Sequence, residues 1–484
     1  MLENRLPPAI PPGTATAVFC YGSCFHRHER IAELSIVVAG VRRHRPAAAR
    51  MPRPDLFQLL HRHPVRDPTW PDDPERRCFR SGFWATVPID ARGHHEGHIE
   101  LEVAARLAGG TELRAPLGRI AVAAPGRPPA VDRALEPGLI AVCMATFEPD
   151  IALLRAQIES LRAQSDRRWI CVVSDDCSGP ERFEQLTALV AGDHRFVVSR
   201  SERRLGFYRN FERALRMAPA EAPLLALCDQ DDVWHPRKLE LLRDGLGHAG
   251  LVYSDLRLVE AGGRVLRDTL WEGRRNNHTN LASLLVANTI PGAAMLFRRE
   301  IAELALPFPD IPGPQLHDHW LGLVALASGD VAYVDRPLYD YVQHRRAVFG
   351  ELEGGARGRG PLRGGRAAYF LGYLAREVQA QTLVIRCGER LTGRKRGALR
   401  RYIAAGRSPV AFAWLAARPL RALAGRNETL GSELDLVRGI VWRWLVAVLA
   451  VGSRTPGRRP CDASFPAADS FDQRRLRRWR AFER

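Results

Sequence analysis

The chain has 484 residues, a formal net charge of +17 and a hydrophobic content of 46%. Its length exceeds that of a typical single domain, so two or three domains are expected, and its apolar content excludes a wholly disordered chain. The charge is unevenly distributed: from residue 351 onward there are 27 Lys+Arg against 11 Asp+Glu, which leaves the first 350 residues close to neutral.

The nine cysteines show no Cys-x-x-Cys spacing, which predicts a reduced, cytosolic chain without a zinc site. The N-terminal stretch MLENRLPPAIPPG lacks the basic start and apolar run of a signal peptide, so none is expected. No run of about 18 apolar residues occurs, so a membrane-spanning helix is not expected either.

Residues 14–125 contain short apolar runs separated by turn-prone stretches such as ARGHHEGH and AGGTEL. This pattern predicts a small β-sandwich-like domain over residues 1–130. A linker composition follows at 125–138. The role of this β-rich accessory domain stays open between binding a glycan, binding partner machinery and scaffolding. The expected strands are TAVFCYGSCF, LSIVVAGV, FWATVPID, HIELEVAARL and RIAVAA.

From Leu139 the pattern changes to alternating strands and helices. Such alternation predicts parallel βαβ units with right-handed crossovers, within a domain over residues 139–350. Farther along, a strand pair, a helix, a strand, a helix at 317–328 and a last strand at 331–344 are expected. The first four strands are predicted at 139–145, 169–176, 196–201 and 224–232, and the helices between them at 150–164, 181–191 and 207–218.

The region 357–452 is arginine-rich and helical in pattern, and residues 453–484 have the composition of a flexible tail. Its arginines alternate with Trp and Leu, as in 411–425 and 433–452. Three interpretations remain open: the helices pack on the catalytic domain, lie on an anionic lipid surface, or bind nucleic acid. The interleaved apolar residues favour the first two.

Polar residues follow three of the predicted strands. Because ligands of parallel α/β sheets bind at the carboxyl ends of the strands, these residues are expected to meet at one edge. They are Thr146 and Glu148 after the first strand, Asp175 and Asp176 after the second, and Asp229 and Asp231 after the fourth.

The Asp-x-Asp of Asp229 and Asp231 fits a site for Mg²⁺ or Mn²⁺, which bind oxygen ligands and bridge to substrate phosphates. The alternative is a turn followed by a helix cap, a role that suits Asp232. The carboxylates of SDDCSGP (174–180) could accept hydrogen bonds from a pyrimidine ring or a ribose. Alternatively, they cap the next helix.

Asp318 lies at the start of a predicted amphipathic helix, between His317 and His319. It is a candidate general base for an acceptor hydroxyl, or a simple helix cap. The two histidines could bind a metal, but residues of this kind are more often partly exposed and merely polar, which is the expectation here. His344 follows the last strand and either reaches the metal and diphosphate or packs.

The segment 139–350 resembles a family-2 glycosyltransferase of the GT-A fold, most closely the bacterial rhamnosyltransferase-like branch. The resemblance is carried by ATFEPD, SDDCSGP, LGFYRNFERAL, CDQDDVWHPRKL and LHDHW, in this order. The sequence departs from the family at Glu148, where Asn is usual, at Cys177, where Gly is common, and after His344.

The resemblance implies an inverting, metal-dependent transfer of a sugar from a nucleotide-sugar donor. It implies that Asp318 is the catalytic base and that Asp231, with help from His344, binds Mg²⁺ or Mn²⁺. It also implies a donor pocket lined by Thr146, Glu148, Asp175, Asp176, Arg209, Asn210 and Asp229.

The leading hypothesis is therefore a cytoplasmic enzyme at the inner face of the membrane. It would transfer a sugar, with rhamnose as the first candidate, to a bacterial surface polysaccharide or its lipid-linked precursor. The alternative is a degenerate glycosyltransferase-like protein that acts as a nucleic-acid- or membrane-binding module through its basic C-terminal region. Intact carboxylates and the lack of a nucleic-acid-binding motif favour the enzyme and a chain that binds no nucleic acid.

Overall fold

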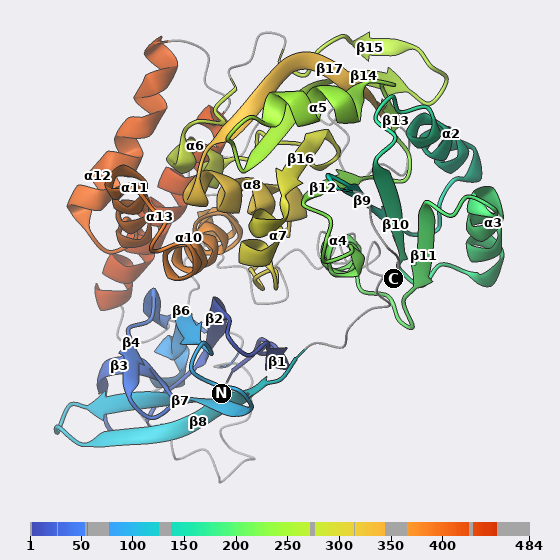
Figure 1. The fold of residues 1–484 in the computed structure, drawn as a ribbon. Coiled ribbons are helices and arrows are strands. Elements are labelled where there is room, and N and C mark those ends of the chain that lie inside the picture. Colours follow the sequence, from blue (N-terminus) through green and yellow to red (C-terminus); the bar gives the residue numbers. More distant parts are fainter. Residues whose placement is uncertain are drawn as a thin grey trace.

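The computed structural model describes residues 2–26, 28–53, 56, 77–124, 137–271, 276–313, 315–343, 365–424 and 429–452. Three parts follow one another along the chain: a β-sandwich, a mixed α/β sheet and a group of helices (Figure 1). The predicted fold class is therefore confirmed: a mostly parallel α/β sheet is preceded by a β-sandwich and followed by a helical region. The predicted domain limits remain predictions.

The N-terminal β-sandwich consists of a five-stranded and a three-stranded sheet. The first has the order β1-β8-β7-β3-β4 and the second β2-β6-β5. Alternate residues such as Ile36, Val87 and Leu101 point between the sheets and are fully buried there. The strands are β1 Ala9–Ile10, β2 Ala15–Ser23, β3 Ile31–Val38, β4 Arg42–His44, β5 Ala48–Met51, β6 Gly82–Asp90, β7 Gly97–Leu107 and β8 Glu112–Val122.

The first half of the central sheet is parallel, with β11, β10, β9 and β12 side by side in that order. These strands are buried runs because helices cover the sheet. The strands are β9 Ile140–Thr146, β10 Trp169–Asp175, β11 Phe196–Arg200 and β12 Leu224–Cys228, and the connecting helices are α2 Ile151–Arg162, α3 Pro180–Val190 and α4 Phe207–Met217.

The second half of the sheet is mixed. β16 runs antiparallel to both β12 and β14, β14 and β17 are parallel, and β13 pairs antiparallel with β17. The strands are β13 Val233–Trp234, β14 Leu251–Glu260, β15 Val265–Arg267, β16 Met295–Arg298 and β17 Val331–Gln343; the helices are α5 Lys238–Leu246, α6 Leu281–Val286, η2 Gly292–Ala294, α7 Arg299–Ala305 and α8 His317–Ser328.

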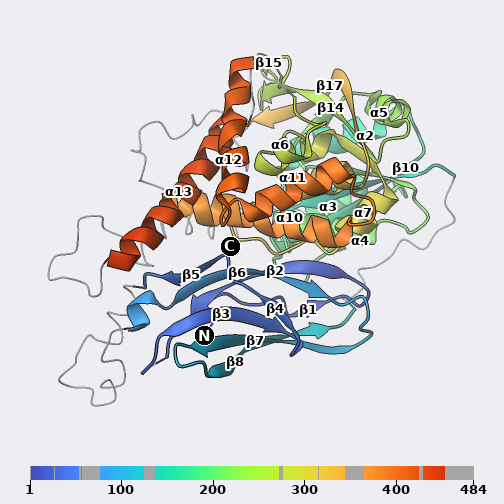
Figure 2. The same ribbon diagram turned by 90° about the vertical axis from the view of Figure 1, so that its left-hand side faces the viewer.

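The C-terminal helices lie between the sandwich and the α/β sheet at one end and extend past the sheet at the other (Figure 2). Phe370 packs its ring against Phe19 and Trp84 of the sandwich. The partly buried Arg386 donates to the carbonyl of Ala15 at 2.6 Å and to that of Ala305 at 2.7 Å. The elements are α9 Gly365–Ala367, the π-helix η3 Ala368–Leu374, α10 Ala375–Arg386, α11 Gly393–Ala404, α12 Pro409–Ala417, η4 Arg418–Ala424 and α13 Leu430–Gly452.

Arg386 joins helix α10 to the β-sandwich and to the α/β part. For α10, the interpretation that the basic helices pack on the catalytic domain is therefore confirmed. Among the described residues, none of the helices is long and apolar enough to cross a bilayer. The predicted tail at 453–484 lies outside the described residues.

One strand prediction needs correction. The fourth strand was expected to run to residue 232, but β12 ends at Cys228. The chain then leaves the sheet, and Val233 and Trp234 pair with β17 instead. Four polar residues therefore lie in a loop between two strands rather than in a strand. The sequence also did not predict β1, β4, β5, β13 and α7.

Candidate functional site

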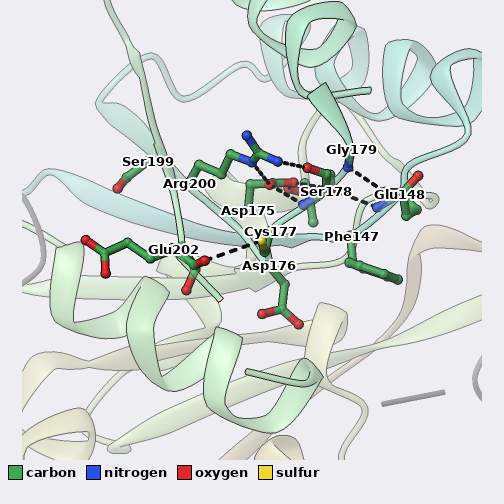
Figure 3. A network of polar contacts seen from close by, with 12 residues as sticks. Phe147, Glu148, Asp175, Asp176, Cys177, Ser178, Gly179, Ser199, Arg200 and Glu202 are labelled. Carbon is green, nitrogen blue, oxygen red and sulfur yellow. Dashed lines mark hydrogen bonds and ion pairs between the residues drawn. The ribbon is translucent and has the colours of Figure 1, made fainter. Parts of the chain in front are cut away.

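The predicted edge of the sheet is formed where β9 and β10 end. Asp175, the last residue of β10, is fully buried and accepts three hydrogen bonds. Thr146 Oγ1 donates to it at 3.0 Å, and the backbone N and Oγ of Ser178 donate at 2.9 and 2.6 Å. Figure 3 shows this carboxylate at the centre of the network, with Arg200 nearby. Thr146 and Asp175 thus bind each other, and their predicted contact with a donor remains a prediction.

Glu148 connects the loops that follow β9 and β10. Its backbone N donates to Ser178 Oγ at 2.8 Å, and its Oε1 accepts from the backbone N of Gly179 at 2.6 Å. Its φ is +42°, and Cys177 opposite has a φ of +63°. That left-handed conformation favours glycine, which explains why a glycine is common at the position of Cys177. Glu148 therefore braces the turn that follows β10.

Asp176 holds the loop before α4. Its two carboxylate oxygens accept from the backbone N atoms of Leu205 at 2.6 Å and Gly206 at 2.9 Å. The guanidinium of Arg204 lies 3.9 Å from this carboxylate and 3.7 Å from the centroid of the Phe147 ring. The Arg204 guanidinium thereby lies over the ring of Phe147, beside the loop.

Asn210 and Arg209, at the start of α4, also contact other parts of the protein. The Asn210 amide donates to the carbonyls of Ser174 at 2.8 Å and Thr146 at 3.2 Å, which joins the ends of β10 and β9. Arg209 binds the carboxylates of Glu212 and Asp310 and donates to the carbonyl of Phe308 at 2.8 Å. Both residues brace the site, and any contact with a donor is a prediction.

The loop after β12 carries the second group of carboxylates. Asp229 and Asp231 are partly exposed, whereas Asp232 is 1% exposed. Between them, Gln230 accepts from the backbone N of Phe147 at 2.8 Å and donates to its carbonyl at 3.2 Å. These two bonds hold the loop after β12 against the loop after the neighbouring strand β9.

Asp232 does not cap the following helix, as one interpretation of the sequence suggested. Helix α5 begins at Lys238, and Arg237 is its N-cap. Asp232 instead accepts from the backbone N of Val342 in β17 at 3.4 Å. Its other oxygen, Oδ2, has no hydrogen-bond partner among the described residues.

Burial raises the pKa of Asp229, and the charges of Asp231 and Asp318 raise it further. Burial and the charges of Asp229 and Asp231 raise the pKa of Asp232 well above its usual range. Asp229 therefore interacts electrostatically with Asp231, Asp232 and Asp318. The start of α8 thus lies close enough to the β12 loop for Asp318 to raise the pKa of Asp229.

Lys238 supplies a positive charge behind this group. It is fully buried; its Nζ donates to the carbonyl of Ala293 and lies 3.6 Å from the centroid of the Trp234 ring. The ammonium lowers the pKa of Asp229 and Asp232, although burial lowers the pKa of Lys238 itself. The protein thus contains part of the countercharge that the carboxylates require.

Asp318 lies in the first turn of α8 but does not cap it, because Leu316 is the N-cap. Its Oδ2 accepts from the side-chain amide of Asn288 at 2.8 Å, and its Oδ1 from the backbone N of His319 at 2.7 Å. Burial raises its pKa to about 6, against the lowering effect of these bonds. A Cβ on Gly292 would lie 3.3 Å from the Asp318 Cβ, so this glycine permits close approach.

His317 and His319 are buried, which corrects the expectation that they are partly exposed. His317 stacks on Phe211 with ring centroids 3.7 Å apart, and His319 Nε2 bonds the carbonyl of Leu284 at 2.6 Å. Burial lowers the pKa of each to about 3, so both are neutral core residues. His344 lies outside the described residues, and its predicted metal contact remains a prediction.

A divalent cation fits the chemistry of this loop. Within the described ranges, three or more His, Cys, Asp or Glu side chains do not gather as a metal cage. Magnesium and manganese do not need one, because one or two carboxylates and the substrate's phosphates suffice. The raised pKa of Asp229 and the unpaired Oδ2 of Asp232 indicate carboxylates that a cation would stabilise.

Residues 141–304 match the family model described as glycosyl transferase family 2. The chain carries a glycosyltransferase domain. This match covers the strands from β9 to β16 and the loops that hold Asp175 and Asp229. Asp318 lies beyond it, on α8.

A curated relative resembles part of the same chain. "Uncharacterized protein y4gI" of Sinorhizobium fredii (strain NBRC 101917 / NGR234) is 35% identical over 145 residues, which is 29% of this chain and 16% of that protein. The chain thus spans only a small share of the length of this relative.

Two solved structures resemble the fold at low sequence identity. S. aureus TarS 1–349 in complex with UDP-GlcNAc is 15% identical, covering 64% of this chain and 92% of that chain at a TM-score of 0.38. The Pyrobaculum calidifontis mannosyltransferase PcManGT, in complex with GDP-Man and Mn²⁺, is 16% identical, covering 67% and 89% at a TM-score of 0.33. The roles of the site residues therefore rest on the geometry of this glycosyltransferase domain.

Four residues of the site were not predicted. Lys238 had a signal, since the chain contains only one other lysine, Lys395, among 71 basic residues. Gln230, Asn288 and Gly292 had none, because their roles depend on which loops meet in space.

Proposed function

We propose that the glycosyltransferase domain transfers a sugar from a nucleoside-diphosphate sugar to a hydroxyl group, with inversion at the anomeric carbon. The acceptor is a bacterial surface polysaccharide or its lipid-linked precursor, and the reaction takes place on the cytoplasmic side of the membrane. The supporting observation is the electrostatic group of Asp229, Asp231 and Asp318 at the carboxyl edge of a sheet that matches family 2. The rhamnosyltransferase-like motifs make rhamnose the first sugar to test.

Asp318 is the proposed base. A carboxylate whose pKa is raised to about 6 is largely ionised at neutral pH and still accepts a proton readily. It removes the proton of the acceptor hydroxyl while that oxygen bonds to the anomeric carbon. The bond from this carbon to the diphosphate breaks on the opposite face, and the nucleoside diphosphate leaves.

Asp229 and Asp231 orient the donor at the loop after β12. A divalent cation held there, with Asp231 as the principal ligand, would neutralise the charge on the leaving diphosphate. Phe147 and Arg204 lie beside the turn formed by Glu148 and Ser178. We assign this side of the edge to the nucleoside, with Thr146, Asp175, Asp176, Arg209 and Asn210 around it.

The test is a donor screen on the full chain. Release of nucleoside diphosphate is followed with deoxythymidine-, uridine- and guanosine-linked sugars, in Mg²⁺ or Mn²⁺ and in a chelator. We expect one donor class to be turned over, only with the cation present. Asp318→Asn should bind that donor normally and lose about 10²–10⁴-fold in rate. Normal turnover by Asp318→Asn would exclude Asp318 as the base, and cation-independent turnover would exclude the metal site.

A further inference from the structure

The C-terminal helices expose large apolar side chains to an unusual degree. Within the described part of the chain, nine large hydrophobic residues are exposed, and six of them lie between residues 410 and 445. Val410 is 82% exposed and Leu423 is 86% exposed. Such a concentration on one short segment marks an interaction surface rather than the scattered apolar residues of an ordinary surface. The six are Val410, Leu420, Leu423, Leu434, Val441 and Leu445.

On α13 these residues form a stripe. Leu434, Val441 and Leu445 are separated by seven and four positions, so at about 100° per residue they lie within about 40° of one another around the helix. The opposite side of α13 is buried, with Leu436 and Ile440 in the core. The exposed residues are thus one face of an amphipathic helix.

The other three exposed residues lie on α12 and on η4, which follows it. Val410 is the second residue of α12, and Leu420 and Leu423 lie in η4. Helices α12 and α13 pack together through Phe412 and Trp444, whose ring centroids are 4.5 Å apart. Figure 2 shows the two helices side by side at the end of the molecule. We name the six exposed residues with their helices α12, η4 and α13 the apolar arm.

The charge around the apolar arm indicates its partner. Residues 365–452 contain 15 Lys+Arg against 5 Asp+Glu, and Arg394, Arg400 and Arg401 are exposed on helix α11 beside the arm. An anionic bilayer offers an apolar interior for the leucines and negative headgroups for the arginines. A second copy of the chain would bring like charges together, and a nucleic acid would leave the leucines unburied.

We propose that the apolar arm binds the surface of an anionic lipid bilayer, with α12 and α13 lying along it. Within the basic C-terminal region, the apolar arm is the part that contacts the membrane. The docking does not depend on the sugar-transfer reaction. Its purpose, the delivery of a lipid-linked acceptor, rests on the proposed function.

A buried polar link attaches the arm to the site. Arg418 at the start of η4 binds Glu433 of α13 at 3.0 Å and donates to Ser283 Oγ at 2.8 Å. Arg421 donates to the same oxygen at 2.9 Å. Ser283 lies on α6, and Asn288 just after α6 donates to Asp318. The arm is thus held against the segment that orients the proposed base, which suits an acceptor arriving from the membrane.

The experiment is flotation of the full chain with vesicles of phosphatidylcholine alone and with phosphatidylglycerol added. We expect binding to the anionic vesicles only, weakened at high salt. The triple variant Leu434→Glu/Val441→Glu/Leu445→Glu should reduce the bound fraction at least about tenfold. Leu423→Glu alone, at an 86% exposed position with little influence on folding, should reduce it severalfold. The matched control Leu113→Glu/Val265→Glu, at exposed apolar residues outside the arm, should bind as the wild type does.

Equal binding of the arm variants and the wild type would overturn the proposal, as would failure of the wild type to bind anionic vesicles. Concentration-dependent dimers that the variants abolish would assign the arm to a second copy instead. Donor hydrolysis without vesicles is measured in the same samples and should be unchanged by the arm variants. Docking without donor turnover would reject the proposed function and leave the arm's role intact.

Discussion

Strands β10 and β12 lie on either side of β9, and each brings a carboxylate to the same edge of the sheet. Asp175 after β10 accepts three hydrogen bonds from Thr146 and Ser178. The Asp229 carboxylate after β12 accepts none from the described residues, and burial and two other carboxylates raise its pKa. The protein therefore uses the first carboxylate to build the edge and leaves the second unsatisfied. A partly buried carboxylate without hydrogen-bond donors has a cost in free energy that a cation or substrate removes on binding.

The largest expected effect on stability belongs to the satisfied carboxylate. In Asp175→Asn, an amide donor replaces one acceptor and faces the N–H or hydroxyl of Ser178. We expect the free energy of unfolding to fall by about 1–3 kcal/mol, as measured by urea denaturation. Asp244→Asn, at an exposed aspartate of α5, is the matched control. If both variants unfold at the wild-type urea concentration, the network in Figure 3 does not stabilise the edge.

The buried lysine tests the other side of the comparison. Lys238→Met removes the ammonium that lowers the pKa of Asp229 and Asp232, so both carboxyls hold their protons more tightly. Protons then compete with the cation up to a higher pH, so the acid limit of Mn²⁺ binding should move upward by about one pH unit, which corresponds to about 1.4 kcal/mol. Calorimetric titration measures it. Lys395→Met, at the only other lysine of the chain, should leave that limit unchanged.

Asp229→Asn should raise the free energy of unfolding, whereas Asp175→Asn should lower it. The folded-state pKa of Asp229 is raised, so ionising it opposes folding at every pH above its unfolded pKa of about 4. Without a cation, the variant should be more stable than the wild type by about 1 kcal/mol at pH 8. The gain should vanish near pH 4, where the carboxyl is protonated in both states. A loss of stability at pH 8 would show that Asp229 is satisfied after all.

Much of this architecture was predictable, for a physical reason. Buried strands and amphipathic helices carry local patterns, so the expected strands at 139–145, 169–176 and 196–201 differ from β9, β10 and β11 by one residue at their ends. The carboxyl ends of neighbouring parallel strands lie at the same edge of a sheet, so the positions of the polar residues after β9, β10 and β12 could also be predicted. The short edge strands β1, β4 and β13 were missed because two or three residues carry no period.

What could not be predicted are properties of the contacts. The sequence around Asp175 and around Asp229 looks alike, with neighbouring carboxylates after an apolar run, yet the Asp175 carboxylate accepts three hydrogen bonds and the Asp229 carboxylate accepts none from the described residues. That difference depends on Thr146 and Ser178, which are brought to Asp175 by strand pairing and by a turn. The burial of His317 likewise depends on Phe211, about a hundred residues earlier, which stacks on it. The exposed face of α13 appears only once Leu436 and Ile440 are known to be in the core.

The smallest expected effect concerns the proposed base. The Asn288 amide donates to Asp318 and lowers its pKa, while burial raises it to about 6. Asn288→Ala removes that bond, so the pKa of Asp318 should rise. Because the base must be ionised, the rising limb of kcat/KM against pH should move upward by about 0.5–1 pH unit, the equivalent of a hydrogen bond of about 1 kcal/mol. Above that limb the variant should regain most of the wild-type rate. A uniform fall in rate with the limb unmoved would mean that Asn288 only shapes the loop after α6, and that Asp318 is not the titrating base.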